Sequence, residues 1–301
     1  MKVAITGANG FVGKVVARRL AEAGHQVVAV VWVLDPNKVD FGEKISCYES
    51  DFSRADLAAA FQGADAIVHL AAARTTPEAD AKGFQPYYEA NVKVAEDVIL
   101  AACQNGVSKI CQASSVAAYS SANVSPYHEG QYPIPLSLYG MSKVACEHLG
   151  ILYGRRFPLR VVSLRFAQVF GIGEREGLMM PKFIRQAREK QTLRIVGQGV
   201  GGRDYVYVKD IAGAIERAIA PEAPAGVFNI GMGHAISVRQ AAEAVNEVFE
   251  NAGNLVFETE KEENKFSFYM DCSRAQAELG WTPAWSLRSG LEDMKLWYAA
   301  G

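Results

Sequence analysis

Short apolar runs alternate with longer amphipathic segments along the first half of the chain. The short runs predict β-strands at Lys2–Thr6, Gln26–Val31, Ile45–Glu49, Ala66–Leu70, Lys109–Ser114 and Arg160–Arg165. The longer segments predict helices at Phe11–Ala23, Arg54–Phe61, Tyr87–Asn105 and Leu136–Arg156. Strands that are apolar along nearly their whole length are buried on both faces, which is typical of a parallel sheet between two layers of helices. The expected fold class is therefore α/β, with a doubly wound parallel sheet.

The spacing of the predicted elements changes after about Phe170. The second half predicts a helix at Met180–Lys190, a short strand at Thr192–Val196, and a strand followed by a helix over Tyr205–Ile219. Another strand is expected at Val227–Gly231, a helix capped by Ser237 at Ser237–Glu250, and two short helices at Ser273–Leu279 and Ser286–Tyr298. We expect one domain over residues 1–169, to which residues 204–232 return. Residues 170–203 and 233–301 would form a smaller lobe over the carboxyl edge of the sheet, where ligands bind in folds of this type.

Composition and charge exclude several classes of partner. The 301 residues are 50% hydrophobic, which is enough for a large core, and the net charge is −2. This charge gives no electrostatic reason to expect nucleic acid or an anionic membrane as a partner. No apolar run reaches the ~18 residues of a spanning helix. The first residues, Met1–Ile5, predict a strand rather than a signal peptide, so we expect a cytoplasmic protein.

The cysteines and histidines lack the pattern of a disulfide framework or a metal site. Cysteine occurs at five widely separated positions without a Cys-x-x-Cys pair, namely Cys47, Cys103, Cys111, Cys146 and Cys272. We expect small buried thiols in a reducing compartment. The five histidines also lack the spacing of metal ligands, so we expect no metal.

A glycine turn follows the first predicted strand and opens the first predicted helix. It has the spacing Gly-x-x-Gly-x-x-Gly, with glycines at Gly7, Gly10 and Gly13 and with Phe11 and Val12 between the last two. Glycines let the backbone approach a pyrophosphate, which the free N–H groups and dipole of the helix N-terminus then hold. In this strand–turn–helix context the motif predicts a Rossmann-type site for NAD or NADP. The alternative is an ordinary glycine turn without a ligand.

The adenosine end of such a site departs from the usual pattern. A carboxylate that binds the ribose is expected about 20 residues after the last glycine. The chain has Val31-Trp32-Val33 there, and Asp35 comes later, beside Pro36. No arginine replaces the acid, so the choice between NAD and NADP is open. Lys14, Arg18 and Lys38 are cations within reach of a 2′-phosphate, although each also fits a solvated surface charge.

Tyr139 and Lys143 are the strongest candidates for catalysis. They are four residues apart on a predicted helix, so they share one face. An ammonium group beside a phenol stabilises the phenolate, which can then act as a base. A tyrosine base together with a dinucleotide site predicts oxidation or reduction at a carbon that bears a hydroxyl.

Landmarks along nearly the whole chain resemble the extended short-chain dehydrogenase/reductases, and within them the NAD-dependent epimerase/dehydratase family. They occur in the order of that family: Gly7/Gly10/Gly13, Asp51-Phe52, His69-Leu70-Ala71-Ala72, Asn91, Ser114-Ser115, Tyr139/Lys143, Arg165, Arg203 with Asp210, Phe228-Asn229-Ile230-Gly231 and Gly280-Trp281. The resemblance implies that residues 1–169 bind the dinucleotide and that the smaller lobe binds the substrate.

The resemblance implies a cofactor role for residues beyond the glycine turn. Asp51 would bind the adenine amino group with Phe52 beside it, although Asp51 also fits a cap of the next helix. Leu70, Ala71 and Ala72 would pass close to the nicotinamide ribose and the phosphates, and Arg74 would reach a phosphate. Asn91 would tie its helix to the active site. Ala167, Tyr139 and Lys143 complete the implied cofactor contacts.

The implied chemistry is reversible oxidation. Ser115 would hydrogen-bond the reacting hydroxyl, and its alternative is a cap at the end of a strand. Relatives that eliminate water carry an acidic residue just after this serine or threonine, whereas this chain has Val116-Ala117-Ala118-Tyr119. The resemblance therefore implies that the chain moves only a hydride and a proton.

The implied substrate is a nucleotide-sugar. Arg203 would hold its diphosphate, as a guanidinium does well; the alternative is a surface ion pair with Asp204 or Asp210. Gln168 would contact the substrate where relatives usually have asparagine. Relatives often carry a second phosphate-binding arginine near the C-terminus, and in the corresponding residues 262–271 Lys265 is the only candidate.

The main hypothesis is an NAD(P)-dependent nucleotide-sugar 4-epimerase. Tyr139 removes the proton of the 4-hydroxyl, the nicotinamide accepts the hydride, and the 4-keto sugar turns before the hydride returns. One alternative is an NADPH-dependent reductase of a 4-keto sugar or another small carbonyl compound, and a second is a non-catalytic dinucleotide-binding protein. Relatives form homodimers through helices that correspond to Tyr87–Asn105 and Leu136–Arg156, so a homodimer is expected.

Overall fold

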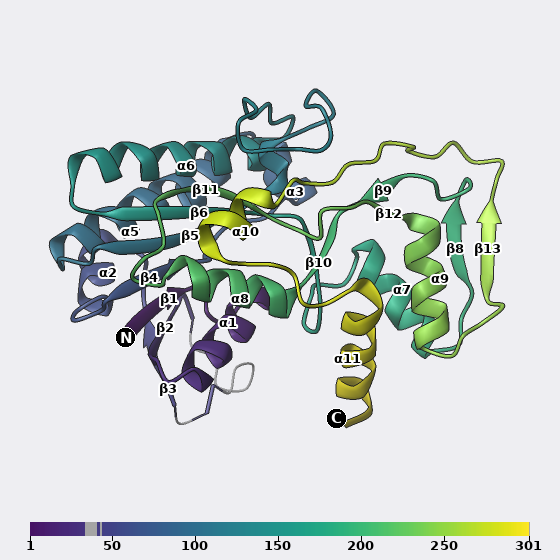
Figure 1. Ribbon diagram of the computed structural model, residues 1–301, viewed down its shortest axis with the longest axis horizontal. Helices are drawn as coiled ribbons and strands as arrows, with labels where there is room; N and C mark the ends of the chain where they lie inside the picture. The colour runs from purple at the N-terminus through teal and green to yellow at the C-terminus, as the bar shows by residue number, and fades with distance from the viewer. Residues whose placement is uncertain (34–40, 43, 301) are drawn as a thin grey trace.

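A seven-stranded parallel sheet forms the centre of the molecule (Figure 1). The computed structural model describes residues 1–33, 41–42 and 44–300, so Asp35, Pro36 and Lys38 lie outside the described residues. The strand order is β11-β6-β5-β4-β1-β2-β3. The strands are β1 (Lys2–Thr6), β2 (Gln26–Val31), β3 (Ile45–Glu49), β4 (Ala66–His69), β5 (Lys109–Ser115), β6 (Arg160–Phe166) and β11 (Gly226–Ile230). The order reverses between β1 and β4, and such a switch point opens a crevice at the carboxyl ends.

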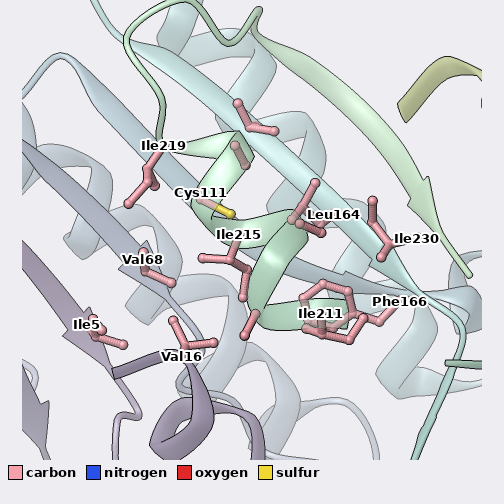
Figure 2. Close-up of a cluster of buried hydrophobic side chains, with 14 of the residues drawn as sticks. Ile5, Val16, Val68, Cys111, Leu164, Phe166, Ile211, Ile215, Ile219 and Ile230 are labelled. Atoms are coloured by element: carbon pink, nitrogen blue, oxygen red, sulfur yellow. The ribbon is translucent and has the colours of Figure 1, made fainter. Parts of the chain in front are cut away.

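Successive residues of the strands face two different layers of helices. Ile5 and Val68 pack on one face with α1 (Phe11–Glu22) and α8 (Val208–Ala218), as Figure 2 shows. Their neighbours Ala4 and Ile67 pack on the other face. That second layer contains α2 (Arg54–Ala60), α5 (Val94–Gln104) and α6 (Leu138–Arg156). Both faces are therefore buried, and the predicted doubly wound α/β fold is confirmed.

A smaller group of elements lies beside the carboxyl edge of the sheet, on the right in Figure 1. It comprises α7 (Met179–Arg188), β8 (Leu193–Val196), α9 (Val238–Val248), β13 (Leu255–Glu258) and α11 (Leu287–Ala300). These elements share a separate apolar cluster that includes Phe183, Leu193 and Val245. Short ladders of β7 (Gln168–Phe170) with β10 (Tyr205–Tyr207) and of β9 (Gly202–Arg203) with β12 (Ile236–Ser237) lead into it. The exact domain boundaries stay a prediction.

Most predicted elements agree with the structure to within about two residues, and Ser237 caps α9 as expected. The predicted helix Tyr87–Asn105 is wrong as a single α-helix. It is divided into α4 (Gln85–Tyr87), a π-helix (Tyr88–Lys93) and α5. Apolar periodicity cannot distinguish these windings because they differ only in the hydrogen-bond partner. The elements α3 (Pro77–Ala81), α10 (Ser273–Leu279) and a 3₁₀ turn (Val116–Ala118) complete the fold.

The expectation that all five thiols are buried is also wrong. Cys111 and Cys146 are buried, Cys103 and Cys272 are half-buried, and Cys47 is exposed. Cys47 is in the middle of β3, the edge strand of the sheet, where only Ile45 is buried. A small residue on an edge strand does not need to be buried, so the location of Cys47 in a predicted strand did not indicate its burial. All five cysteines are free thiols.

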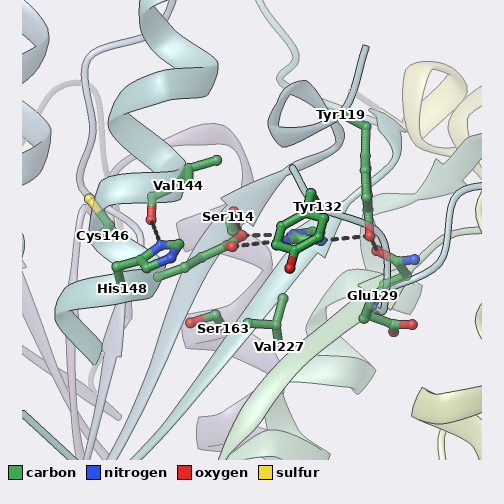
Figure 3. A network of polar contacts seen from close by, with 12 residues as sticks. Ser114, Tyr119, Glu129, Tyr132, Val144, Cys146, His148, Ser163 and Val227 are labelled. Atoms are coloured by element: carbon green, nitrogen blue, oxygen red, sulfur yellow. Dashed lines mark hydrogen bonds and ion pairs between the residues drawn. The ribbon is translucent and has the colours of Figure 1, made fainter. Parts of the chain in front are cut away.

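A buried ion pair fixes α6 on the sheet (Figure 3). Arg165 on β6 donates to both carboxylate oxygens of Glu147 on α6, at 2.9 and 2.7 Å. Ser114 on β5 donates to the same carboxylate. On its other side Arg165 donates to the hydroxyl of Tyr119 at 2.6 Å, and Tyr119 donates to the side chain of Asn229 at 3.0 Å. The network joins α6 to three strands, β5, β6 and β11.

Substitution of Arg165 should test how strongly this network holds the fold. Arg165→Met leaves the buried Glu147 carboxylate without a cation, and breaking a buried pair typically costs about 3–5 kcal/mol. We expect a loss of that size in the free energy of unfolding, measured with urea. The double variant Glu147→Leu with Arg165→Met should recover most of it. Lys261→Met, which removes an exposed pair with Glu258, is the control and should stay near wild type. Equal losses in the single and double variants would contradict the pairing argument.

Candidate active site

The glycine turn brings β1, β2 and α1 into close contact. The N–H of Gly7 donates to the carbonyl of Val30 on β2 at 3.0 Å, and that of Gly10 donates to the carbonyl of Gly7 at 3.0 Å. Gly7 has a φ of +69°. A Cβ atom on Gly13 would lie 2.2 Å from the Gly7 carbonyl oxygen. The three glycines therefore allow a backbone path that residues with side chains would block.

A cavity of about 410 Å³ opens at the carboxyl ends of β1, β4, β5 and β6. It brings together most of the predicted cofactor and catalytic residues, which are Gly7, Gly10, Phe11, Val12, Gly13, Leu70, Ala72, Ser115, Tyr139, Lys143, Ala167 and Gln168. Arg74 also lines it, as expected for a residue near a phosphate. These residues come from five segments of the chain, so only the fold places them together.

Lys143 and Tyr139 face the cavity from the first turns of α6. The Lys143 Nζ atom donates to the carbonyl of Ala113 on β5 at 3.0 Å and lies 5.7 Å from the centroid of the Tyr139 ring. Lys143 is buried, whereas Tyr139 is half-buried. The ammonium is thus held close to the phenol by a backbone carbonyl. A charge fixed in this way can stabilise a phenolate.

Ser115 lies at the end of β5 on the same cavity. Its Oγ atom accepts a hydrogen bond from the N–H of Ala117 at 3.1 Å, so it caps the short 3₁₀ turn. The cap uses Oγ only as an acceptor, and its hydroxyl hydrogen can still be donated. A Cβ atom on Gly140 would lie 2.1 Å from the Ala117 carbonyl oxygen. Gly140 therefore lets α6 lie directly against the turn that Ser115 caps.

Asn91 does not line the cavity but connects two segments that do. Its side chain accepts from the N–H of Ala73 at 2.7 Å and donates to the Ala73 carbonyl at 3.1 Å. It also donates to the hydroxyl of Ser142 at 2.9 Å, next to Lys143 on α6. Asn91 is within the π-helix, a winding that is frequent at functional sites. The structure therefore gives it a positioning contact.

Asp51, Phe52 and Ala71 also lie outside the cavity lining. The Asp51 carboxylate accepts from the N–H of Ser53 at 2.7 Å, and hydrogen bonds from Ser53 lower the pKa of this carboxyl. Phe52 is buried beside it with a φ of 60°. Ala71 packs against the turn, with its N atom 2.7 Å from where a Cβ on Gly7 would lie. All three lie close to the site without facing this cavity.

Arg203 lines a second cavity of about 550 Å³, and Gln168 lines both cavities. Arg203 donates to the carbonyls of Gly202 and Phe266 at 2.8 and 2.7 Å. The alternative ion pair with Asp204 is not what the structure shows, because that carboxylate accepts backbone N–H groups of Met232, Gly233 and Met270. Lys265 is not among the described residues that line this cavity, but Lys182 and Arg194 are.

Sequence reasoning missed the loop between β7 and α7. Glu174 lines the second cavity and Arg175 lines the first, so the loop separates the two. Burial raises the pKa of Glu174 to about 7, against the opposing effect of Arg74 and Arg175. The sequence hints at this part of the site only through the adjacent opposite charges of Glu174 and Arg175 after Gly171 and Gly173. Solvated loops carry the same pattern, so it does not identify a site.

The part of the chain that the structure describes has neither a membrane-spanning helix nor a cluster of metal ligands. None of its helices is long and apolar enough to cross a membrane. No three His, Cys, Asp or Glu side chains within residues 1–33, 41–42 and 44–300 are close enough to hold a metal ion.

Comparison with known proteins agrees with this geometry. A model of the NAD dependent epimerase/dehydratase family matches residues 3–231, which include the glycine turn, Ser115, Tyr139, Lys143 and Arg203. The chain belongs to this family. It is an enzyme of the extended short-chain dehydrogenase/reductase type.

Similar members of the epimerase/dehydratase family align along their whole length. The UDP-glucose 4-epimerase of Corynebacterium glutamicum is 28% identical over 97% of both chains. A crystal structure of UDP-N-acetylglucosamine 4-epimerase from Bacillus cereus is 30% identical, covers 100% of this chain and 97% of its own, and has a TM-score of 0.89. UDP-glucuronic acid 4-epimerase from the same species, in complex with UDP-glucuronic acid and NAD, is 26% identical, covers 100% and 99%, and has a TM-score of 0.86.

Substitution of Gly13 tests the tightness of the turn. Gly13→Ala places a methyl group 2.2 Å from the Gly7 carbonyl, so the turn must open. We expect a lower free energy of unfolding, by roughly the 1–3 kcal/mol of an overpacked site, together with weaker binding of NAD in a calorimetric titration.

Gly213→Ala is the matched control for this substitution. Gly213 is in the interior of α8, and its nearest neighbours would be 3.7 Å from a Cβ atom. Alanine is favoured over glycine in a helix. We therefore expect this variant to unfold at the same or a higher urea concentration and to bind NAD as the wild type does. If Gly13→Ala behaved like this control, the turn would not be as tight as the structure shows.

Proposed function

We propose that the chain is an NAD-dependent 4-epimerase of a nucleotide-sugar. The observation that carries the proposal is the shared cavity of Ser115, Tyr139, Lys143 and the glycine turn, which meets the Arg203 cavity at Gln168. The first cavity contains the candidate base Tyr139 and the glycine turn for the dinucleotide. The second contains the Arg203 guanidinium, which suits a diphosphate. The relatives that are named as 4-epimerases of UDP-sugars support the same substrate class.

The residues at the turn fit NAD. Gly7 has a left-handed backbone and Gly13 has no room for a Cβ atom, so the turn packs tightly at the start of α1. Gly7, Gly10, Phe11, Val12 and Gly13 of this turn line the cavity. N–H groups at a helix N-terminus hold a pyrophosphate well. Gly10, Phe11 and Val12 would hold it, and Lys143 would bind the nicotinamide ribose. Bound NAD would supply reversible acceptance of a hydride.

Tyr139 acts as the base in this proposal. Its hydroxyl, as phenolate, takes the proton of the sugar hydroxyl at carbon 4 while Lys143 stabilises the negative charge. Ser115 donates a hydrogen bond to the oxygen at carbon 4 and orients it. The same tyrosine returns the proton once the keto sugar has turned. The side chains that follow Ser115, Val116, Ala117 and Ala118, supply no second acid for elimination.

Arg203 would bind the diphosphate, and its two hydrogen bonds to carbonyls hold the guanidinium in place for this. Gln168, between the two cavities, would contact the sugar. Its side chain is one methylene longer than the asparagine of relatives, which favours a pocket of different depth. The proposal includes the predicted homodimer, since Met141, Ile151 and Leu152 on α6 are exposed apolar residues that a partner helix would cover.

Replacement of the base tests the mechanism. Tyr139→Phe removes the hydroxyl and keeps the ring, and loss of a general base typically costs 10²–10⁴-fold, so kcat should fall by at least about 100-fold. NAD affinity should change little by comparison. Tyr132→Phe, at a side chain that is 88% exposed, is the control and should match the wild type. Turnover of Tyr139→Phe within a few fold of wild type would refute the role of Tyr139.

Product analysis tests the reaction itself. We expect purified enzyme to interconvert a UDP-sugar and its 4-epimer in the presence of NAD without net consumption of cofactor. UDP-glucose, UDP-N-acetylglucosamine and UDP-glucuronic acid are the first substrates to separate. Consumption of one NADPH for each keto sugar reduced would instead identify the reductase. Binding of NAD without turnover of any of these compounds would favour the non-catalytic protein.

The carboxyl of Glu174 should make substrate binding depend on pH. Its pKa of about 7 means that the group becomes negative as the pH rises through 7, although Arg74 and Arg175 offset part of the charge. The substrate is an anion, so KM should rise between pH 6 and pH 8 by roughly threefold, the scale of one charge pair in a screened site. In Glu174→Gln this rise should disappear. Glu176→Gln, at an exposed position of the same loop, should keep it. An unchanged pH profile in Glu174→Gln would contradict the assignment.

A further inference from the structure

The adenosine half of the dinucleotide site contains an exposed aromatic pair. In a doubly wound sheet the dinucleotide spans the switch point, here between β1 and β4, with its adenosine on the side of the first two strands. Gly7 is bonded to Val30, so the end of β2 adjoins the glycine turn. Trp32 follows β2 directly, at the place where a carboxylate for the ribose is usual.

The Trp32 ring packs on Phe52, which follows β3. The ring centroids are 5.8 Å apart and the planes are inclined by 25°, which is a stacked arrangement. Phe52 is only 6% exposed, whereas Trp32 is 65% exposed. One side of the indole is thus supported by a buried ring, and much of the remaining surface faces solvent. A large aromatic surface in this position needs an explanation, because burial would have been more favourable.

The conformation of Phe52 is a second, independent observation. Its φ of 60° lies in the left-handed region, which is unfavourable for a bulky residue. Its N–H donates to the hydroxyl of Ser50 at 3.0 Å, and Asp51 beside it is held by Ser53. Strained residues of this kind persist where the surroundings fix them, often at ligand sites. The residue with this unfavourable backbone is the one whose ring lies against Trp32.

We propose that Trp32, supported by Phe52, is the platform on which the adenine ring of the cofactor stacks. The inference rests on the proposed function only in taking NAD as the cofactor. Stacking replaces the ribose carboxylate as the main source of affinity at this end, and the Asp51 carboxylate at the rim then contacts the amino group of the base. Aromatic stacking accepts any purine face, so the platform selects for the base and not for the 2′ position of the ribose.

Calorimetric titration with fragments of the cofactor tests the platform. Trp32→Ala should weaken binding of AMP and of NAD by roughly 10–100-fold, the usual range for loss of a stacked base. Nicotinamide mononucleotide, which has no adenine, should bind as to the wild type. Trp32→Phe should restore most of the affinity for AMP. Trp297→Ala, an exposed tryptophan on α11, is the matched control and should leave all three affinities unchanged.

Fluorescence supplies a readout that does not depend on activity. AMP should quench tryptophan emission in the wild type and in Trp297→Phe, but not in Trp32→Phe. Unchanged affinity for AMP in Trp32→Ala, or an equal loss for AMP and nicotinamide mononucleotide, would overturn the platform and leave the proposed function intact. Wild-type protein that binds neither AMP nor NAD would overturn both. Trp32-dependent binding of NAD without epimerisation would support the platform and refute the proposed reaction.

Discussion

The position of α6 along the strands of the sheet is the constraint on which the candidate active site depends. The proposed reaction requires Tyr139 and Lys143 to lie beside Ser115 at the end of β5. Each successive turn of α6 makes a contact that fixes this position. Gly140 touches the turn after Ser115, Lys143 bonds to Ala113, and Glu147 bonds to Ser114 and Arg165. Two turns are thus held by buried charged groups and one by a missing side chain. Hydrogen bonds and ion pairs are directional, so they allow only one position of α6. Apolar packing alone is not directional and would allow the helix to shift along the sheet.

Buried polar contacts of this kind cost stability unless every group has a partner, and here the partners are present. The Glu147 carboxylate is bonded on both oxygens, and Arg165 continues through Tyr119 to Asn229 on β11. Because β11 comes late in the chain, the sheet is complete only when residues 226–230 have joined β6. Helix α6, which carries Tyr139 and Lys143, is therefore positioned by the finished fold, which is an argument against a functional fragment of the first 169 residues.

Features that depend on a local sequence pattern were predicted, and features that depend on tertiary contacts were missed. Apolar strands and the glycine turn appear as short patterns. Ser115, Tyr139 and Lys143, which the resemblance implied, line one cavity, and their roles stay a prediction. The π-helix around Asn91 was not predictable, because apolar periodicity does not distinguish it from an α-helix and the bonds of Asn91 to Ala73 and Ser142 join residues far apart in the sequence. Glu174 was missed for a similar reason: its burial, and so its raised pKa, exists only where the two cavities meet.

The two ends of the site are built in different ways, and this bears on specificity. Tyr139, Lys143 and Ser115 are on elements of the main sheet layer, held by backbone and buried ionic contacts. Gln168 and Arg203 are on short two-stranded ladders, and Glu174 is on the loop between β7 and α7, outside the main sheet. Under the proposed function, the reacting groups are held by the main sheet layer, and the residues that would contact the sugar and its diphosphate lie on shorter elements and a loop. A substitution at Gln168 should therefore alter which sugar is accepted long before it alters the fold.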